Sequence, residues 1–311
     1  MFFSITVLGS NSALPAHGRH PTSQLLNIHD HFFLVDCGEG TQMRLEACKI
    51  RHGRIEHIFI SHLHGDHFFG LIGLITSYHL NHRERPLTIF CPKGLDEIIH
   101  LQLKYSDTHL NYPLHFVHFE PRSGNVLFEN DFLQVITLKL THRIPCAGFV
   151  FREKPSSEKN IRPEKINEYH LTVPQIQQAK KGQDIRLADG RIIHNQELTI
   201  PVPPPRVYAY CTDTLYDSTI IPFIEGADLL YHEATFEHHL QQRAKETFHS
   251  TTIQAAEIAL QACVKKLMIG HFSARYRHLD NLLSEARSVF PNTILAEEGK
   301  TIDIPRILPS T

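Results

Sequence analysis

The chain has 311 residues, of which 41% are hydrophobic and 21% charged, a composition that excludes intrinsic disorder and is typical of an enzyme-sized globular protein. Its 31 basic residues nearly balance its 33 acidic ones, so net charge does not indicate a nucleic-acid partner, and any RNA-binding surface must be a local patch. No apolar run approaches the roughly 18 to 20 residues that span a bilayer, and the N-terminus lacks the features of a signal peptide, so we expect a soluble, cytoplasmic protein without a membrane partner.

The first half of the chain reads as short apolar strands followed by helices. Strands are expected at FFSITVLG, SQLLNI, HFFLVDCG and IEHIFISH, with turn residues between them. A helix is expected from Phe68 to Leu80, where apolar residues recur at helical spacing, and a second over residues 93–105. Further strands are expected at LTIFCP, at FLQVITLKLTH after a turn at residues 129–131, and at AGFVF. Strand, helix, strand is the order of a layered α/β protein.

Residues 152–206 differ in character from the rest of the chain. They are polar, contain a Lys180-Lys181-Gly182 cluster and end in three consecutive prolines at 203–205. Ten basic and seven acidic residues give this segment a charge of +3, although the whole chain carries −2. We interpret it as an arm inserted into a single domain that spans residues 1–311. Composition alone fits a solvated loop of mixed charge equally well.

After the arm, strands are expected at RVYAYCTD and DLLYHEA. The next helix, IQAAEIALQAC, can be capped by Thr251, with Gln254 completing a capping box. A strand at KKLMIGH, a helix that begins at Asp280 and a final strand at TILAEEG complete the chain.

The positions of the cysteines and histidines limit which kinds of functional site the chain can contain. The six cysteines lie far apart, mostly in apolar runs and without a CxxC pair, so we expect buried free thiols. Histidine is unusually frequent, with 24 in the chain. A single histidine is most often a surface or hydrogen-bonded residue, so position must decide which ones bind a metal or take part in catalysis.

The strongest local signal is the segment HLHGDH, which follows the apolar strand IEHIFIS and precedes a helix. Three imidazoles and one carboxylate beside an apolar strand all need polar partners, which favours metal binding over packing. The glycine lets the loop bend tightly, so that its side chains can turn toward one point. The candidate ligands are His62, His64, Asp66 and His67.

Three more residues of ligand type directly follow apolar runs of strand length: His142, Asp213 and His271. Ligands of open α/β sheets bind at the carboxyl ends of the strands, so these side chains can converge with the HLHGDH loop. Each alone is a weak signal, because a histidine after a strand is often a hydrogen-bonded edge residue and Asp213 can cap a turn.

Together the seven residues exceed what one tetrahedral zinc ion uses and suit two ions. We assign His62, His64 and His142 to one ion, Asp66, His67 and His271 to the other, and Asp213 to a bridging position. Two ions about 3.5 to 4 Å apart lower the pKa of a shared water to near 7 and stabilise both oxygens of an in-line displacement, which favours phosphoryl chemistry. The same ligands also accept manganese or iron.

With these ligands in this order, the sequence resembles the metallo-β-lactamase superfamily, whose four-layer αββα sandwich binds one or two metals at the sheet edges. The segments DCGEGTQ at 36–42, HEAT at 232–235 and GHFSARY at 270–276 narrow the resemblance to the ribonuclease Z family. It implies a zinc-dependent homodimer that removes the 3′ trailer of precursor tRNA and leaves a 3′-hydroxyl on the tRNA. It also implies that Asp66 acts as general base, and that His249 with Glu233 protonates the leaving oxygen.

The resemblance implies further contacts with RNA. Arg275 is a candidate phosphate clamp, with a surface salt bridge as the alternative. Arg19 falls where the family has a proline and arginine loop near the end of the tRNA. The arm falls where the family carries a flexible exosite for tRNA, which makes Lys180 and Lys181 candidate phosphate contacts.

Two other classes of function stay open. A hydrolase of the same fold that acts on a small ester or a cyclic phosphodiester would use the same seven ligands, and the arm would discriminate between the two substrates. A metal-stabilised scaffold or RNA-binding module would retain its activity after Asp66→Ala.

Overall fold

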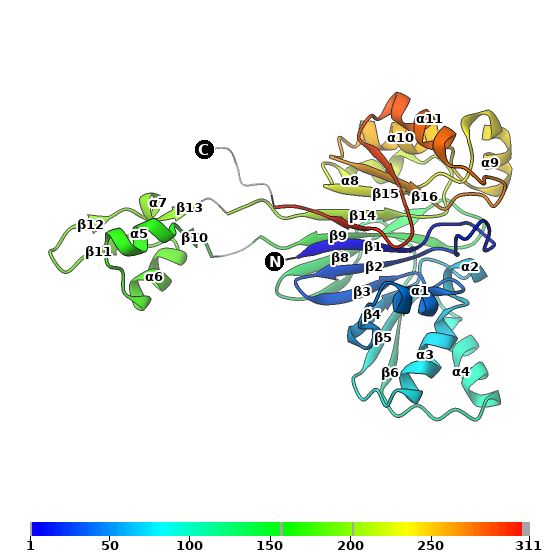
Figure 1. Ribbon diagram of the computed structural model, residues 1–311, viewed down its shortest axis with the longest axis horizontal. Coiled ribbons are helices and arrows are strands. Elements are labelled where there is room, and N and C mark those ends of the chain that lie inside the picture. Colours follow the sequence, from blue (N-terminus) through cyan, green and yellow to red (C-terminus); the bar gives the residue numbers. More distant parts are fainter. Residues whose placement is uncertain (1, 156–157, 201, 307–311) are drawn as a thin grey trace.

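The computed structural model describes residues 2–155, 158–200 and 202–306. Within them, two seven-stranded sheets pack face to face and helices cover both outer faces (Figure 1). This is the αββα sandwich expected from the sequence. It forms because the strands alternate between two apolar faces, each of which needs a covering layer.

The first sheet is antiparallel from β18 to β3 and parallel from β3 to β6. In spatial order it comprises β18 (Thr301–Asp303), β1 (Phe3–Gly9), β2 (Ser23–Ile28), β3 (His31–Val35), β4 (Ile55–Phe59), β5 (Leu87–Cys91) and β6 (Leu114–His118). The outer face of this sheet is covered by α1 (Thr41–Ala47), α3 (Leu71–Leu80) and α4 (Leu95–Tyr105). The 3-10 turn η1 (His52–Arg54) precedes β4.

The second sheet is parallel from β17 to β14 and antiparallel from β14 to β7. In spatial order it comprises β17 (Thr293–Leu295), β16 (Leu267–Gly270), β15 (Leu229–Glu233), β14 (Val207–Cys211), β9 (Cys146–Glu153), β8 (Leu133–Leu140) and β7 (Val126–Glu129). Its outer face is covered by α8 (Ile221–Ile224), α10 (Thr252–Gln261) and α11 (Asp280–Val289). The 3-10 turns η2 (Ser218–Ile220) and η3 (His238–Leu240) lie in its connections.

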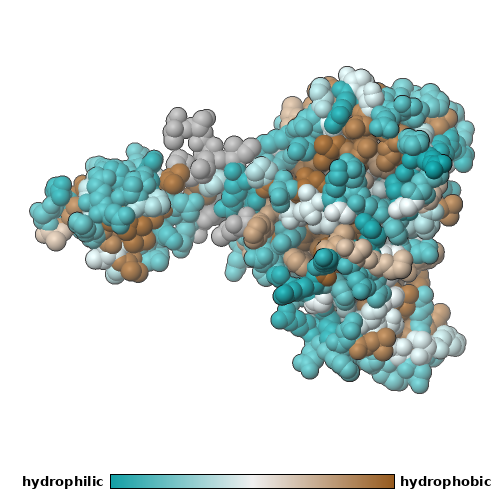
Figure 2. Space-filling model, in the orientation of Figure 1, coloured by the Kyte–Doolittle hydropathy of each residue, from teal (hydrophilic) through white to brown (hydrophobic). Residues whose placement is uncertain are grey.

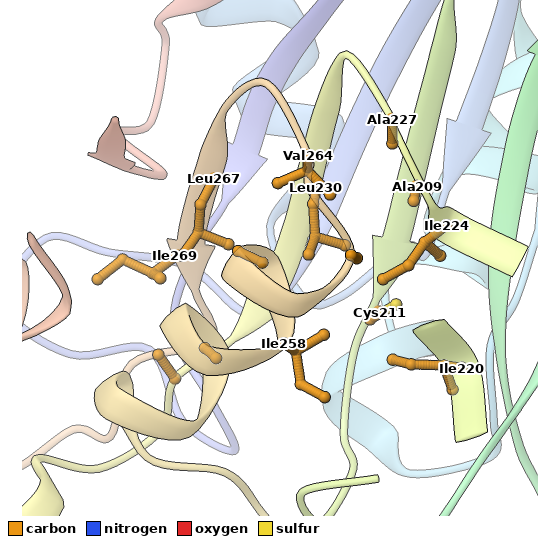
Figure 3. Packing of buried hydrophobic residues seen from close by; sticks show 14 of the residues in the cluster. Ala209, Cys211, Ile220, Ile224, Ala227, Leu230, Ile258, Val264, Leu267 and Ile269 are labelled. Carbon is orange, nitrogen blue, oxygen red and sulfur yellow. The ribbon is translucent and has the colours of Figure 1, made fainter. Parts of the chain in front are cut away.

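Strand alternation builds the core. In β4, Phe59 points between the sheets, whereas Ile58 packs under the helices of the first sheet, as does Ile60 just beyond the strand. On the other side, alanines of α10 let the helix approach β15 and β16 closely, and Ile258 fills the space beside Cys211 and Leu230 (Figure 3). Each large apolar side chain that is fully buried contributes about 1.5–3 kcal/mol of transfer free energy.

The helix boundaries confirm one sequence prediction and correct another. The capping box at α10 is present, because Thr251 Oγ1 accepts from Gln254 N and Gln254 Oε1 accepts from Thr251 N. The helix expected from Phe68 to Leu80 is present as α3 but begins later, at Leu71, because Phe68 ends a separate short helix, α2 (Gly65–Phe68). The chain breaks at Gly70 because its amide bonds to Cys37 O, and a Cβ there would lie 2.2 Å from Gly38 O.

Several elements were not expected from the sequence, including α1, β6, β7 and β18, and α9 (Gln241–Thr247). Their apolar residues are too few or too scattered to produce a clear period. All six cysteines are free, and four of them are buried as expected, whereas Cys48 is half-buried and Cys263 is exposed. No helix among the described residues is both long and apolar enough to cross a lipid bilayer.

The segment between β9 and β14 stands away from the sandwich (Figure 1), and hydrophilic side chains cover most of the face seen in Figure 2. It has a small core of its own, made of Leu171, Ala179, Ile185, Ile193 and Leu198. Its elements are β10 (Asn160–Ile161), α5 (Pro163–Glu168), α6 (Val173–Lys180), β11 (Ile185–Arg186), β12 (Ile192–Ile193), α7 (Asn195–Leu198) and β13 (Thr199–Ile200).

Candidate metal centre

Strand direction explains why the candidate ligands meet. In the second sheet β8, β14 and β16 run the same way, so the residues that follow them, His142, Asp213 and His271, emerge at one edge. The loop after β4 of the first sheet reaches the same edge and carries the HLHGDH segment into α2. Both α2 and α9 lie at this end of the sandwich, on opposite sheets (Figure 1).

The seven side chains form two groups, each with ligand atoms within 4.8 Å of one another: His62, His64, His142 with Asp213, and Asp66, His67 with His271. In the first group, His64 Nδ1 lies 3.0 Å from His62 Nε2 and 3.1 Å from His142 Nε2. In the second group, Asp66 Oδ2 lies 3.5 Å from the Nε2 atoms of both His67 and His271.

Asp213 joins the two groups, with one carboxylate oxygen facing each. Its Oδ2 lies 3.6 Å from His62 Nε2 and 3.7 Å from His142 Nε2. Its Oδ1 lies 3.3 Å from His67 Nε2 and 3.1 Å from His271 Nε2. This is the geometry of a carboxylate that can bridge two cations.

Hydrogen bonds fix the imidazole rings from behind. His67 Nδ1 bonds to Asp36 Oδ2 at 2.8 Å, and His142 Nδ1 to the carbonyl oxygen of Phe248 at 2.9 Å. In His271, Nδ1 lies 2.9 Å from Thr235 Oγ1. Such outer contacts orient metal-binding histidines and select their tautomer.

The other ring nitrogens of His67 and His271 give the strongest evidence that the site fits a metal ion. Both Nε2 atoms are buried, and neither has a hydrogen-bond partner among the described residues. A buried imidazole nitrogen without a partner is costly unless it binds a metal. The residues present therefore suit a divalent metal ion.

The electrostatics agree with this interpretation. Burial lowers the pKa of His62, His64 and His142 and favours the neutral ring that binds metal. Burial acts in the same direction on His67, but the surrounding carboxylates outweigh it and raise its pKa well above the ordinary value. The carboxylates thus favour a cation at this point, which a divalent metal supplies.

His249 and Glu233 form a pair beside the second group. His249 Nδ1 lies 2.9 Å from Glu233 Oε1, which leaves Nε2 as the ring atom available to a substrate. Glu233 is fully buried and also accepts hydrogen bonds from the amides of Thr214, Thr235 and Ser250. Burial would lower the pKa of His249, but the charge of Glu233 and the bond to it outweigh burial and raise the pKa to about 9.

A cleft of about 600 Å³ opens onto the metal centre. The candidate phosphate clamp Arg275 lines it, with its guanidinium 5.0 Å from the centre of the Phe236 ring. Arg143 and Arg243 also line it, and sequence reasoning missed both. Arg143 directly follows the ligand His142, a position that could have drawn attention to it, whereas nothing in the sequence marks Arg243.

The other candidate RNA contacts lie elsewhere. The Arg19 guanidinium is engaged with Asn11 Oδ1 and with the carbonyl oxygens of Tyr276 and Arg277, so it ties two loops together. Lys180 and Lys181 lie in the arm, at the opposite end of the sandwich from α2 and α9 (Figure 1). The structure thus brings Asp66, His249 and Arg275 to one cleft, with Glu233 buried behind His249, and leaves these three basic residues outside the cleft.

Two supporting residues received no role from the sequence. Asp36, in left-handed backbone with φ 54°, accepts from His67, from Ser61 and from Tyr210 of the opposite sheet. Its place directly after a strand is the signal that could have found it. Ala13 N donates to Asp66 Oδ2 at 2.7 Å, a backbone contact between distant loops that no sequence pattern reveals.

Comparison with known proteins supplies the family. Residues 3–155 match the family model described as anti-Pycsar protein Apyc1. The chain is 46% identical over 302 residues to ribonuclease Z of Bacteroides fragilis, covering 97% of this chain and 99% of the relative. It is 45% identical over 302 residues to ribonuclease Z of Cytophaga hutchinsonii, covering 97% and 96%.

Solved structures agree. The short form of human tRNase Z superposes with a TM-score of 0.71 at 27% identity, over 97% of this chain and 99% of that one. The metallo-β-lactamase fold protein YhfI from Bacillus subtilis, 21% identical, superposes with a TM-score of 0.68 over 97% of this chain and 100% of that one, and so shares the fold. Together with the curated relatives, these similarities confirm the resemblance seen in the motifs: the chain belongs to the ribonuclease Z family, with the metallo-β-lactamase fold.

Proposed function

We propose that this protein is a zinc-dependent endoribonuclease that removes the 3′ trailer of precursor tRNA and leaves a 3′-hydroxyl on the tRNA. The observation that carries the proposal is Asp213, whose two carboxylate oxygens each face a separate group of ligands, in a chain 46% identical to a ribonuclease Z. Two zinc ions held by these groups would polarise the scissile phosphate and lower the pKa of an attacking water.

Different residues of the chain accept and donate the protons of the reaction. Burial would raise the pKa of Asp66, but the charge of His67 and the hydrogen bonds from His271 and His67 lower it, so Asp66 is in the carboxylate form that accepts a proton from water. Ala13 N also donates to this carboxylate. His249 is protonated at neutral pH and donates its proton to the leaving O3′. Glu233 holds the ring of His249 and stabilises its charge. Arg275 in the cleft binds a phosphate oxygen.

The proposed role of the arm is to hold tRNA. Several of its basic residues are neutralised locally, as where Lys165 pairs with Glu168 and Arg191 with Asp189. Lys180, Lys181 and Arg186 form no ion pair with another described residue, so their charges remain available to phosphates.

Arm and metal centre lie at opposite ends of the sandwich (Figure 1), so an RNA held by both must span the molecule or reach the centre of a second copy. The second arrangement fits a homodimer, in which the arm of one subunit serves the other, acting in the cytoplasm. Sedimentation of the intact protein should give twice the mass of the chain, and a monomer at all concentrations would contradict this arrangement.

The proposed function is tested by incubating the zinc-loaded protein with an end-labelled precursor tRNA and mapping both product ends. We expect a tRNA that ends in a 3′-hydroxyl and a trailer that begins with a 5′-phosphate, and no cleavage after treatment with a chelator. A protein that leaves the precursor intact but hydrolyses a small ester or a cyclic phosphodiester would contradict the proposal and favour the small-molecule alternative.

A further inference from the structure

A second cleft lies next to the cleft at the metal centre, and His249 stands between them. This second cleft has a volume of about 460 Å³, and His249 lines both clefts. Its remaining walls come from α9, from the first turn of α10 and from the segment that follows Asp213. They include Tyr216, Gln241, Gln242, Lys245 and Gln254.

The second cleft has the chemistry of a site for ribose and phosphate. No carboxylate lines it, and Lys245 is exposed and forms no ion pair with any described residue. Besides His249, the other polar walls are neutral amides and the Tyr216 hydroxyl, which lies 3.0 Å from Gln261 Nε2. Lysine and neutral side-chain donors are the groups that contact phosphate and sugar without reading the base sequence.

Part of the lining of the metal-centre cleft is apolar and belongs to this cleft but not to the second one. Phe69 is 64% exposed and lines this cleft together with Leu14, which is 62% exposed. The Phe69 ring rests on the backbone of Gly65, where a Cβ would lie 2.1 Å from it, so the ligand loop supports the ring from behind. An exposed ring with a fixed back face is a platform on which an unpaired base can stack.

The bonds that form and break during cleavage determine which end of the RNA lies on which side of the metal centre. This inference rests on the proposed function. A water oxygen bonds to phosphorus as the bond from phosphorus to O3′ of the tRNA breaks. The proton of the water passes to Asp66 and the proton of His249 passes to O3′. Because O3′ must therefore lie at His249, the last ribose of the tRNA lies on the side of the second cleft. The attacking and leaving oxygens are in line, so O5′ and the trailer leave sideways from that axis.

We propose that the RNA crosses the metal centre in this one direction. The ribose-phosphates at the 3′ end of the tRNA occupy the second cleft, where Lys245 binds a phosphate. The first base of the trailer stacks on Phe69.

The first half of the test compares Lys245→Gln with Lys104→Gln, which removes an exposed lysine from α4 on the other sheet. Two precursors are used, one with a long trailer and one with a single-nucleotide trailer. We expect Lys245→Gln to raise KM about threefold to tenfold for both precursors alike, to leave kcat nearly unchanged and to reduce the salt dependence by about one ion. A penalty confined to the long trailer, or a KM equal to that of Lys104→Gln, would overturn the proposal.

The second half uses Phe69→Leu and precursors whose first trailer nucleotide either carries a base or is abasic. We expect a loss of about fivefold to tenfold in kcat/KM with the base present and no loss with the abasic nucleotide. An equal loss on both precursors refutes stacking, and an unchanged zinc content verifies that the metal centre is intact. Cleavage of every precursor by the wild type tests the proposed function separately, and failure there would overturn this inference with it.

Discussion

At the scale of single residues, Asp36 links the two sheets through the metal centre. It directly follows β3 in the first sheet, bonds to the candidate ligand His67 and accepts at 2.6 Å from the hydroxyl of Tyr210 in the second sheet. Burial strengthens these interactions because water does not compete for the carboxylate. Asp36 thus connects the packing of the two sheets to the orientation of the His67 ring.

Asp36→Asn is expected to weaken metal binding about 10-fold to 100-fold, because an amide cannot offset the charge that ligation places on His67. Tyr210→Phe removes only one donor to the same carboxylate, so its effect should be smaller. Zinc affinity measured by competition with a chromogenic chelator tests both variants. Equal affinity in the wild type and Asp36→Asn would show that His67 is oriented by its other neighbours.

The pair of His249 and Glu233 predicts a pH dependence. Because Glu233 raises the pKa of His249 to about 9, the protonated ring persists through neutral pH and is lost as pH rises through that value. In Glu233→Gln the attraction disappears while burial remains, so the pKa falls and the loss of activity moves to lower pH. Following the ring protons of His249 by NMR titration checks this directly. A His249 pKa equal in the two proteins would contradict the pairing, and unchanged thermal unfolding controls for misfolding.

At the scale of elements, the break between α2 and α3 lets the chain pass close to the loop after β3. Gly70→Ala places a Cβ 2.2 Å from the carbonyl oxygen of Gly38, so backbone must move, and we expect a destabilisation of about 1–3 kcal/mol. Gly73→Ala, one turn later, is the matched control. That position is exposed and helical with no atom closer than 3.5 Å, so alanine should stabilise by about 1 kcal/mol. Urea unfolding measures both, and the same sign for the two variants would contradict the packing argument.

At the scale of the whole molecule, the arm joins the sandwich at a buried ion pair. Arg206 donates to both oxygens of Glu153, and Glu153 N donates to Arg206 O at 2.9 Å, so the two ends of the arm are adjacent strand positions. His29 also contacts Glu153, at 2.6 Å. Removing one partner of a buried ion pair lowers the free energy of unfolding by about 3–5 kcal/mol, so this pair holds the two ends of the arm in place on the sandwich.

The adjacency of the two ends permits a clean deletion. Residues 155–204 can be replaced by an Asn-Gly hairpin turn, because the strands on either side already pair. We expect precursor tRNA cleavage to fall by at least about 100-fold from the lost phosphate contacts, with hydrolysis of a chromogenic phosphodiester unchanged. Parallel loss of both activities, with the unfolding temperature retained, would refute a role of the arm in RNA binding. Lys180→Gln with Lys181→Gln should give a smaller loss that high salt abolishes.

The sequence by itself determined most of the strands, the capped helix and the residue types at the candidate metal centre, because these depend on neighbours within one turn or one strand. The short apolar run IEHIFIS and the capping box at Thr251 are local patterns that the fold retains. The seven candidate ligands could be singled out in advance because each stands within two residues of the end of a strand or in one short loop.

Only the tertiary structure decided which groups support that set, because their partners lie far away along the chain. Ala13 meets Asp66, Tyr210 meets Asp36 and Arg19 meets Tyr276 across separations that no local period encodes. The same holds for the break at Gly70, which depends on contact with a loop thirty-two residues earlier. Long-range contacts of this kind follow from the packing of two sheets against each other, so they could be seen only once both sheets were in place.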